Sequence, residues 1–175
     1  MKKAITICAL LLSSTLYAQQ VQKETSGIIS YASDHISQLA EAIPEDQYSW
    51  SPEEGVRTVS EVIGHVISAN YFFGSKMGAM VPEGINPQTI ATDLTTKAEL
   101  TAALKESTDF IVAAINGVDD AALAEAVEFP FPGEYTTMTA ILIAQGHVQE
   151  HLGQLIAYAR SNGITPPWSA STADN

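Results

Sequence analysis

Apolar residues recur at helical spacing in four long segments of this 175-residue chain. The first runs from about residue 21 to 43, the second opens near residue 58, the third begins near residue 97, and the fourth spans residues 137–161. In the first segment, one stripe holds Ile28, Ala32, Ile36, Leu39 and Ile43. Steps of three and four residues place such side chains on one helix face, so the pattern predicts four helices of about 20 residues and little strand.

Local signals mark the ends of these helices. Thr58 is followed three residues later by Glu61, and Thr96 by Glu99, and both pairs are capping-box signatures that open a helix. The Asn-Gly pair at 162–163 is typical of a helix C-terminus. These signals place the second, third and fourth helices.

Two loops of more than ten residues separate the second helix from the third and the third from the fourth. The first, Pro82–Thr95, is rich in Pro, Gly and Asn. The second includes residues 119–127, which could add a short helical turn, and two prolines in Phe129–Gly133 that exclude a helix interior. Four amphipathic helices joined by loops predict an all-α four-helix bundle. The long loops would serve as crossovers or as a lid over one end.

The first 18 residues have the layout of a secretory signal peptide. Lys2 and Lys3 form a basic start, Ala4–Leu12 is apolar, and Ser13–Ala18 is a small-residue exit. The apolar run is shorter than the roughly 20 residues that a membrane-spanning helix needs. We therefore expect cleavage after Ala18, export to a periplasm or beyond, and no membrane span. The bundle would occupy residues 19–168, followed by a disordered tail at 169–175.

Composition narrows the chemistry of the mature chain. The only cysteine, Cys8, lies in the signal segment, which excludes disulfides, thiolate metal ligands and a cysteine nucleophile from residues 19–175. Those residues include six basic and twenty acidic side chains, a net charge of −14. A surface this acidic repels phosphate backbones, and no basic patch interrupts it. We expect a small-molecule substrate and no nucleic-acid partner.

Two of the four histidines, His147 and His151, lie four residues apart in the apolar fourth helix. Because a helix turns once in about 3.6 residues, both imidazoles lie on one face, close enough to bind one cation. Burying two imidazoles costs free energy unless their nitrogens find partners. The pair is therefore a candidate metal site, and the alternative is a buried pair that hydrogen-bonds to carbonyls or to a carboxylate.

A stable divalent site usually takes a third ligand from the protein. His65 lies among apolar residues of the second helix and should point inward, whereas His35 lies nearer the edge of the first helix. We predict that His65, His147 and His151 bind the metal. Neutral imidazoles suit a divalent transition metal better than calcium or magnesium. Zinc is the first choice, with nickel, iron, manganese and cobalt as alternatives.

Two other metal motifs fit less well. His147 to His151 also matches the His-x-x-Glu-His pattern of inverted zinc peptidases, with Glu150 as general base. Those enzymes take an acidic ligand from well downstream, and the only acidic residue after His151 is Asp174. Ferritin-like di-iron sites need a glutamate three residues before a histidine, which neither Glu61 nor Glu150 provides.

The stretch His147-Val148-Gln149-Glu150-His151-Leu152-Gly153-Gln154 resembles the His-x-x-x-His-x-Gly-Gln signature of the DinB-like family. Residues 48–52, Tyr-Ser-Trp-Ser-Pro, together with residues 57–65, resemble its Trp-x-Pro loop and the helix that bears its first ligand. Residues 160–167 are similar to the ending common in such proteins. The resemblance covers nearly all of the mature chain, from about Ile28 to Trp168.

The resemblance implies a four-helix bundle in an unusual order, often a homodimer, with a divalent metal on three histidines. By motif these fall on His65, His147 and His151, and no metal role is implied for His35. Family members with a defined activity are metal-dependent thiol S-transferases or related isomerases and hydrolases.

Three neutral imidazoles would leave the ion with an open position, where a bound water could lose a proton near neutral pH. Gln154 is the candidate catalytic residue, because it could hydrogen-bond this water or a substrate; alternatively, it is a buried amide that ties two helices. Glu61 could orient His65 or serve only as a cap. Arg57 could meet an anionic substrate or pair with surface carboxylates.

These observations favour an exported metal-dependent hydrolase or group transferase that acts on a small molecule. One alternative is a non-catalytic metal-binding bundle in which the ion joins the second and fourth helices. Another is a family fold whose site binds no metal.

Overall fold

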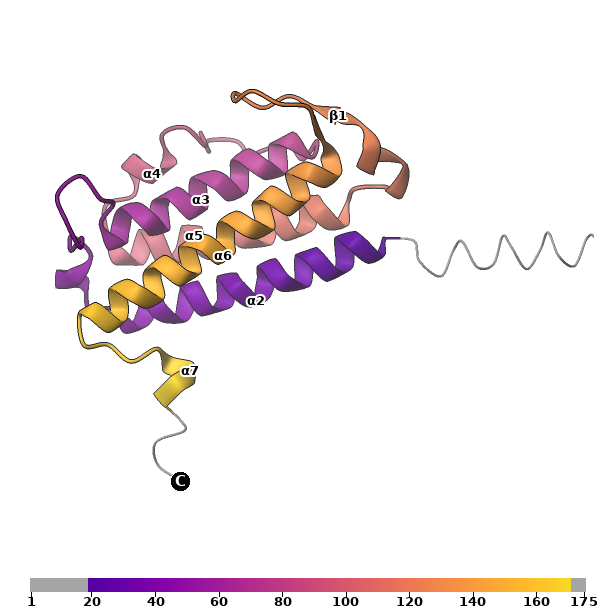
Figure 1. Ribbon diagram of the computed structural model, residues 1–175. Helices are drawn as coiled ribbons and strands as arrows, with labels where there is room; N and C mark the ends of the chain where they lie inside the picture. The colour runs from indigo at the N-terminus through magenta and orange to yellow at the C-terminus, as the bar shows by residue number, and fades with distance from the viewer. Residues whose placement is uncertain (1–18, 171–175) are drawn as a thin grey trace, which may run out of the picture.

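The computed structural model describes residues 19–170, so the predicted signal peptide lies outside the described residues. Its helices are α2 (Gln20–Ala42), α3 (Val59–Lys76), α4 (Ile90–Asp93), α5 (Lys97–Asn116), α6 (Thr137–Ser161) and α7 (Pro167–Ala170). Single 3-10 turns occupy Glu45–Gln47 and Asp120–Ala124. Strands β1 (Ala126–Val127) and β2 (Tyr135–Thr136) pair in antiparallel fashion. The four long helices α2, α3, α5 and α6 form the predicted bundle (Figure 1).

The helices are not arranged in chain order around the bundle. The packed pairs of long helices are α2–α5, α2–α6, α3–α5 and α3–α6. Figure 1 shows α2 and α6 running in one direction and α3 and α5 in the other. Because α3 and α5 are parallel, the chain between them must return along the bundle, and α4 lies on that path. The Pro82–Thr95 loop is therefore a crossover.

Capping boxes open three of the long helices. Thr58 accepts a hydrogen bond from the Glu61 amide at 3.3 Å, and the Glu61 carboxylate accepts one from the Thr58 amide at 2.7 Å. Thr96 and Glu99 are reciprocally bonded at the start of α5, so both boxes predicted from the sequence are confirmed. A third box, between Thr136 and Thr139, opens α6. The sequence pattern missed it because a threonine stands where glutamate is usual.

The core lies where the four long helices meet. Its fully buried side chains come from every one of them and include Ile36, Leu39, Val62, Ile63, Val66, Ile67, Leu104, Ile111, Ile115, Ile141 and Leu155. One predicted position is wrong: Ile28 is 38% exposed, whereas its neighbour Ile29 is 1% exposed. Successive helical residues are rotated by about 100°, so Ile29 faces the core and Ile28 lies at its edge.

The described chain continues beyond α6 as far as Ala170. Gly163 has a φ of 73°, the left-handed conformation that ends a helix. The chain then forms α7, which includes Ser169. Pro167 occupies the first position of this helix, where the missing N–H costs nothing. The Trp168 ring packs against His35 of α2 with centroids 4.2 Å apart, which anchors the segment. Residues 171–175 lie outside the described part of the chain.

No helix within residues 19–170 is both long enough and apolar enough to cross a membrane.

Gly74 tests the packing of α3 against α5, and Gly27 in α2 serves as the control. A Cβ at Gly74 would collide with the Phe110 ring, so Gly74→Ala is expected to lower the free energy of unfolding by about 1–3 kcal/mol. A Cβ at Gly27 in α2 would meet nothing, so Gly27→Ala is expected to raise it by about 0.5–1 kcal/mol. Urea unfolding followed by circular dichroism measures both. Equal effects of the two substitutions would contradict the close approach.

Candidate metal centre

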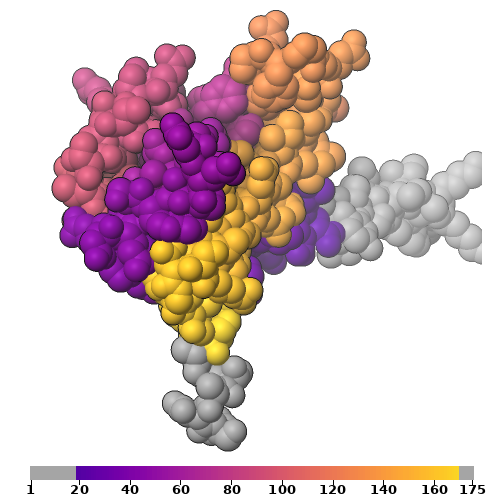
Figure 2. Space-filling model, turned by 60° about the vertical axis from the view of Figure 1, so that its left-hand side comes forward, coloured from indigo at the N-terminus to yellow at the C-terminus, as the bar shows by residue number. Residues whose placement is uncertain are grey.

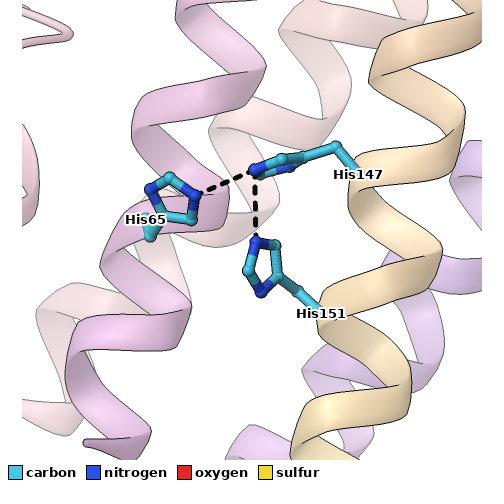
Figure 3. Close-up of side chains that lie close together, drawn as sticks. All are labelled: His65, His147 and His151. Carbon is cyan, nitrogen blue, oxygen red and sulfur yellow. Dashed lines mark hydrogen bonds between the residues drawn. The ribbon is translucent and has the colours of Figure 1, made fainter. Parts of the chain in front are cut away.

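His65 of α3 faces His147 and His151 of α6 across the contact between these two helices (Figure 3). The Nε2 atom of His147 lies 2.9 Å from His65 Nε2 and 3.2 Å from His151 Nε2. One ligand atom from each residue lies within 4.8 Å of the others. Two imidazole nitrogens on one tetrahedral zinc ion are about 3.3 Å apart. The three histidines predicted from the sequence are brought together and could hold one metal ion.

Helix geometry explains this convergence. The four-residue spacing places His147 and His151 on one face of α6, and the antiparallel packing of α3 brings His65 opposite them. Next to His65 in α3, Gly64 packs so closely on α4 that a Cβ there would lie 3.1 Å from the Ala91 carbonyl oxygen. The helical turn that carries His65 is thus packed between α6 and α4.

The three rings lie at the boundary between core and solvent. His151 is 5% exposed, and His65 and His147 are partly exposed. Burial, helped by the charges of Arg57 and His151, lowers the pKa of His65 to about 4. Burial, helped by His151, His65 and Arg57, lowers the pKa of His147 to about 3. Both rings are therefore neutral near pH 7, the form in which imidazole binds a metal.

A chain of hydrogen bonds sets the tautomer of His151. Its Nδ1 lies 2.8 Å from the Oε1 of Gln154, and an amide oxygen only accepts, so Nδ1 carries the proton. Gln154 in turn donates to the Tyr158 hydroxyl at 2.8 Å, which donates to the Arg57 carbonyl at 3.0 Å. The Nε2 of His151 is left with a lone pair directed at His147. Histidines that bind a metal through one ring nitrogen typically donate the N–H of the other to such a partner.

This tautomer makes the cluster receptive to a cation. The His151 Nε2 must accept, so the contact to His147 Nε2 needs a proton on His147. That same nitrogen also approaches His65 Nε2, and one N–H cannot serve both contacts well. A single cation would satisfy all three lone pairs at once, which is the chemistry that the donor set fits.

The other residues considered from the sequence have different roles. The Nδ1 of His35 lies 2.9 Å from the Tyr31 carbonyl oxygen, on the outer face of α2. The Glu61 carboxylate bonds to the Thr58 amide, so its capping role is the one observed. Gln154 positions His151, and its contact with a bound water or substrate stays a prediction.

Aromatic side chains lie beside the site. The Phe73 ring is 5.7 Å from the His147 ring, and Phe129, from the β1–β2 loop, packs on Phe72 and Phe73 at 6.0 and 6.1 Å. Tyr135 of β2 packs on Phe129 at 5.1 Å. The loop therefore covers the C-terminal half of α3 next to the histidines. Only the tertiary fold could reveal the position of Phe129, which lies 56 residues from Phe73 in the sequence.

The fold and the site together define a helical bundle with three histidines that could hold one metal ion. Residues 29–155 match the sequence profile of the DinB superfamily, a span that includes the three histidines and Gln154. The chain belongs to this superfamily, which confirms the resemblance stated from the motifs.

Known proteins share this architecture. The chain is 26% identical to the uncharacterized protein YjoA of Bacillus subtilis over 149 residues, 81% of this chain and 93% of YjoA. A DinB-like protein from Bacillus cereus has a TM-score of 0.66 and 17% identity, covering 79% of this chain and 90% of its own. The mycothiol-dependent maleylpyruvate isomerase has a TM-score of 0.62 and 16% identity, covering 77% of this chain and 60% of its own. The colibactin self-resistance protein ClbS was solved in complex with double-stranded DNA. Its TM-score is 0.57 at 16% identity, and the match covers 79% of this chain and 95% of the ClbS chain. These structures share the fold.

The lowered pKa values predict how the stability of metal-free protein depends on pH. An unfolded histidine binds a proton below about pH 6.5, whereas folded His65 and His147 stay neutral down to about 4 and 3. Stability should therefore fall as the pH drops from 6.5 to 5, before most carboxylates titrate. His147→Gln is expected to flatten this fall, measured by urea midpoints in the presence of a chelator. An unchanged slope in His147→Gln would contradict the neutral buried ring.

Proposed function

We propose that this protein is a metal-dependent enzyme that catalyses hydrolysis or group transfer on a small molecule at His65, His147 and His151. The observation that carries the proposal is the convergence of three imidazole nitrogens from two helices, with spacings of 2.9 and 3.2 Å. Three protein ligands leave a divalent ion at least one open position, as catalytic sites require. The partial exposure of His65 and His147 lets a small molecule approach.

The donor set favours zinc first, with nickel, iron, manganese and cobalt as alternatives. All three ligands are nitrogen atoms, whereas calcium and magnesium prefer oxygen. When bound, the ion would supply Lewis acidity toward water or a substrate donor atom. The protein's own part is to keep His65 and His147 neutral and to hold His151 through Gln154 in the tautomer whose Nε2 accepts.

The mycothiol-dependent maleylpyruvate isomerase, which shares the fold, is named for a reaction on a small molecule, and this supports a small-molecule substrate here. A small-molecule substrate also agrees with the net charge of −12, which disfavours a phosphate backbone. ClbS has been solved with DNA, so the absence of a nucleic-acid partner stays a prediction from charge. A homodimer also stays a prediction.

The metal content of purified protein tests the centre directly. Protein produced without a histidine tag is expected to contain about one equivalent of a divalent transition metal. His65→Ala and His147→Ala should each abolish stoichiometric binding, because two remaining imidazoles make a poor site. Elemental mass spectrometry after gel filtration gives the ratio.

Two further variants serve as controls in the same measurement. His35→Ala should retain the metal, because this ring contacts Tyr31 and Trp168 instead of the cluster. Gln154→Ala should bind more weakly by about 10- to 100-fold, because His151 loses its partner. No metal in wild type, even after incubation with each ion, would overturn the proposed enzyme. Full binding without turnover would favour the alternative in which the ion only joins α3 to α6.

We also propose that the chain is exported and cleaved after Ala18. The Gln19 backbone nitrogen donates to both carboxylate oxygens of Asp120, at 2.9 and 3.0 Å. Cleavage there would leave α2, which begins at Gln20, complete. It would also convert this nitrogen to an α-ammonium group that already faces a carboxylate. Gln22 donates to the same carboxylate at 2.9 Å, so the contact is part of the bundle.

The mass of exported protein tests this processing. We expect mature protein that starts at Gln19, and Asp120→Asn should destabilise it by up to about 1 kcal/mol because the new charge loses its partner. Asp119→Asn is the matched control, since the Asp119 side chain makes no cap hydrogen bond. Intact mass and thermal unfolding below pH 7 are measured. Retention of residues 1–18, or equal effects of the two substitutions, would refute the proposal.

A further inference from the structure

Tyr158 of α6 connects the candidate metal centre to the loop before α3. Its hydroxyl accepts a hydrogen bond from the Gln154 amide nitrogen at 2.8 Å and donates one to the Arg57 carbonyl oxygen at 3.0 Å. The Trp50 ring packs on the Tyr158 ring in a T-shaped arrangement, with centroids 5.2 Å apart. Figure 2 shows the segment before α3 (purple) against the C-terminal part of the chain (yellow). Tyr158 therefore contacts the loop through both its ring and its hydroxyl.

The Arg57 carbonyl sets the direction of this hydrogen-bond chain. A backbone carbonyl can only accept, so the Tyr158 hydroxyl must donate to it. The hydroxyl oxygen is then left to accept, so the Gln154 amide presents its NH2 group to Tyr158 and its oxygen to His151. A side-chain amide has nearly the same shape in either orientation, so its contact with the imidazole alone would not choose between them.

The loop that carries the Arg57 carbonyl is itself fixed by hydrogen bonds. The Val59 amide donates to the Trp50 carbonyl at 3.0 Å, which ties the loop to the start of α3. The Tyr48 hydroxyl donates to the Ala40 carbonyl at 2.7 Å, which ties the loop to α2. This loop contains no histidine, but it holds the acceptor from which the chain of hydrogen bonds to His151 takes its direction.

We propose that Tyr158 is a positioning residue of the metal centre, because it orients the Gln154 amide and thereby keeps the His151 proton on Nδ1. Without the hydroxyl, the amide can rotate and present its NH2 group to the ring. An NH2 group only donates, so His151 would then carry its proton on Nε2, and this nitrogen would have no lone pair for a metal. The effect on metal binding rests on the proposed function, whereas the effect on the tautomer does not.

The tautomer of His151 and the zinc affinity together test this role. NMR of isotope-labelled imidazole nitrogens distinguishes protonated from unprotonated ring nitrogens, and His151→Gln identifies the His151 signals. Metal-free wild type at about pH 8, where an ordinary imidazole is neutral, should carry the proton on Nδ1. Tyr158→Phe should shift the proton toward Nε2 and lower the zinc affinity about tenfold, measured by competition with a chelator.

Two comparisons separate positioning from general damage to the fold. Tyr48→Phe also removes a hydroxyl that donates to a backbone carbonyl, but that bond joins the loop to α2, so the His151 tautomer and the zinc affinity should stay as in wild type. A carboxylate accepts at either oxygen and needs no orienting partner. Adding Tyr158→Phe to Gln154→Glu should therefore change the zinc affinity by less than about twofold.

The outcomes distinguish this inference from the proposed function. An unchanged His151 tautomer in Tyr158→Phe would overturn the role of Tyr158, and so would an equal loss of zinc affinity in the Gln154→Glu background. A changed tautomer with unchanged zinc affinity would overturn the link to the metal. Failure of wild type to bind any divalent metal would overturn the proposed function, while the NMR comparison would still decide whether Tyr158 orients Gln154.

Discussion

The contact between α3 and α6 is the constraint on which the chemistry of this protein depends. Two helix faces pack as part of one core, and His65 of α3 meets His147 and His151 of α6 across the contact. Burial keeps His65 and His147 neutral, and Gln154 keeps the His151 lone pair directed at His147. The packing therefore brings three imidazole nitrogens close to one another, in an arrangement that could hold one metal ion.

The order of the helices determines what surrounds that cluster. Because α3 and α5 are parallel, a long crossover returns the chain outside α3 and leaves the α3–α6 side free of it. The loop before α3 then lies at one end of the cluster, with Trp50 and Arg57, and the β1–β2 loop lies at the other, with Phe129. Aromatic side chains from two loops, Trp50 and Phe129, therefore lie toward opposite ends of the cluster.

The sequence by itself determined the features that depend on neighbours within a few turns. The helix bounds, the boxes at Thr58 and Thr96, and the shared face of His147 and His151 follow from helical periodicity and local hydrogen bonding, which act before any tertiary contact forms. The inward position of His65 followed from the apolar residues around it. The Ile28 prediction failed by one residue because adjacent positions at the edge of a stripe are decided by what packs against them.

Only the tertiary structure decided which distant groups meet. Loop length was compatible with a lid or a crossover, and the direction of α5 relative to α3 settled that choice. The link from Gln154 through Tyr158 to Arg57 joins residues 97 positions apart. Such contacts carry no local sequence signal, because their free energy comes from bringing remote segments together after the helices have formed.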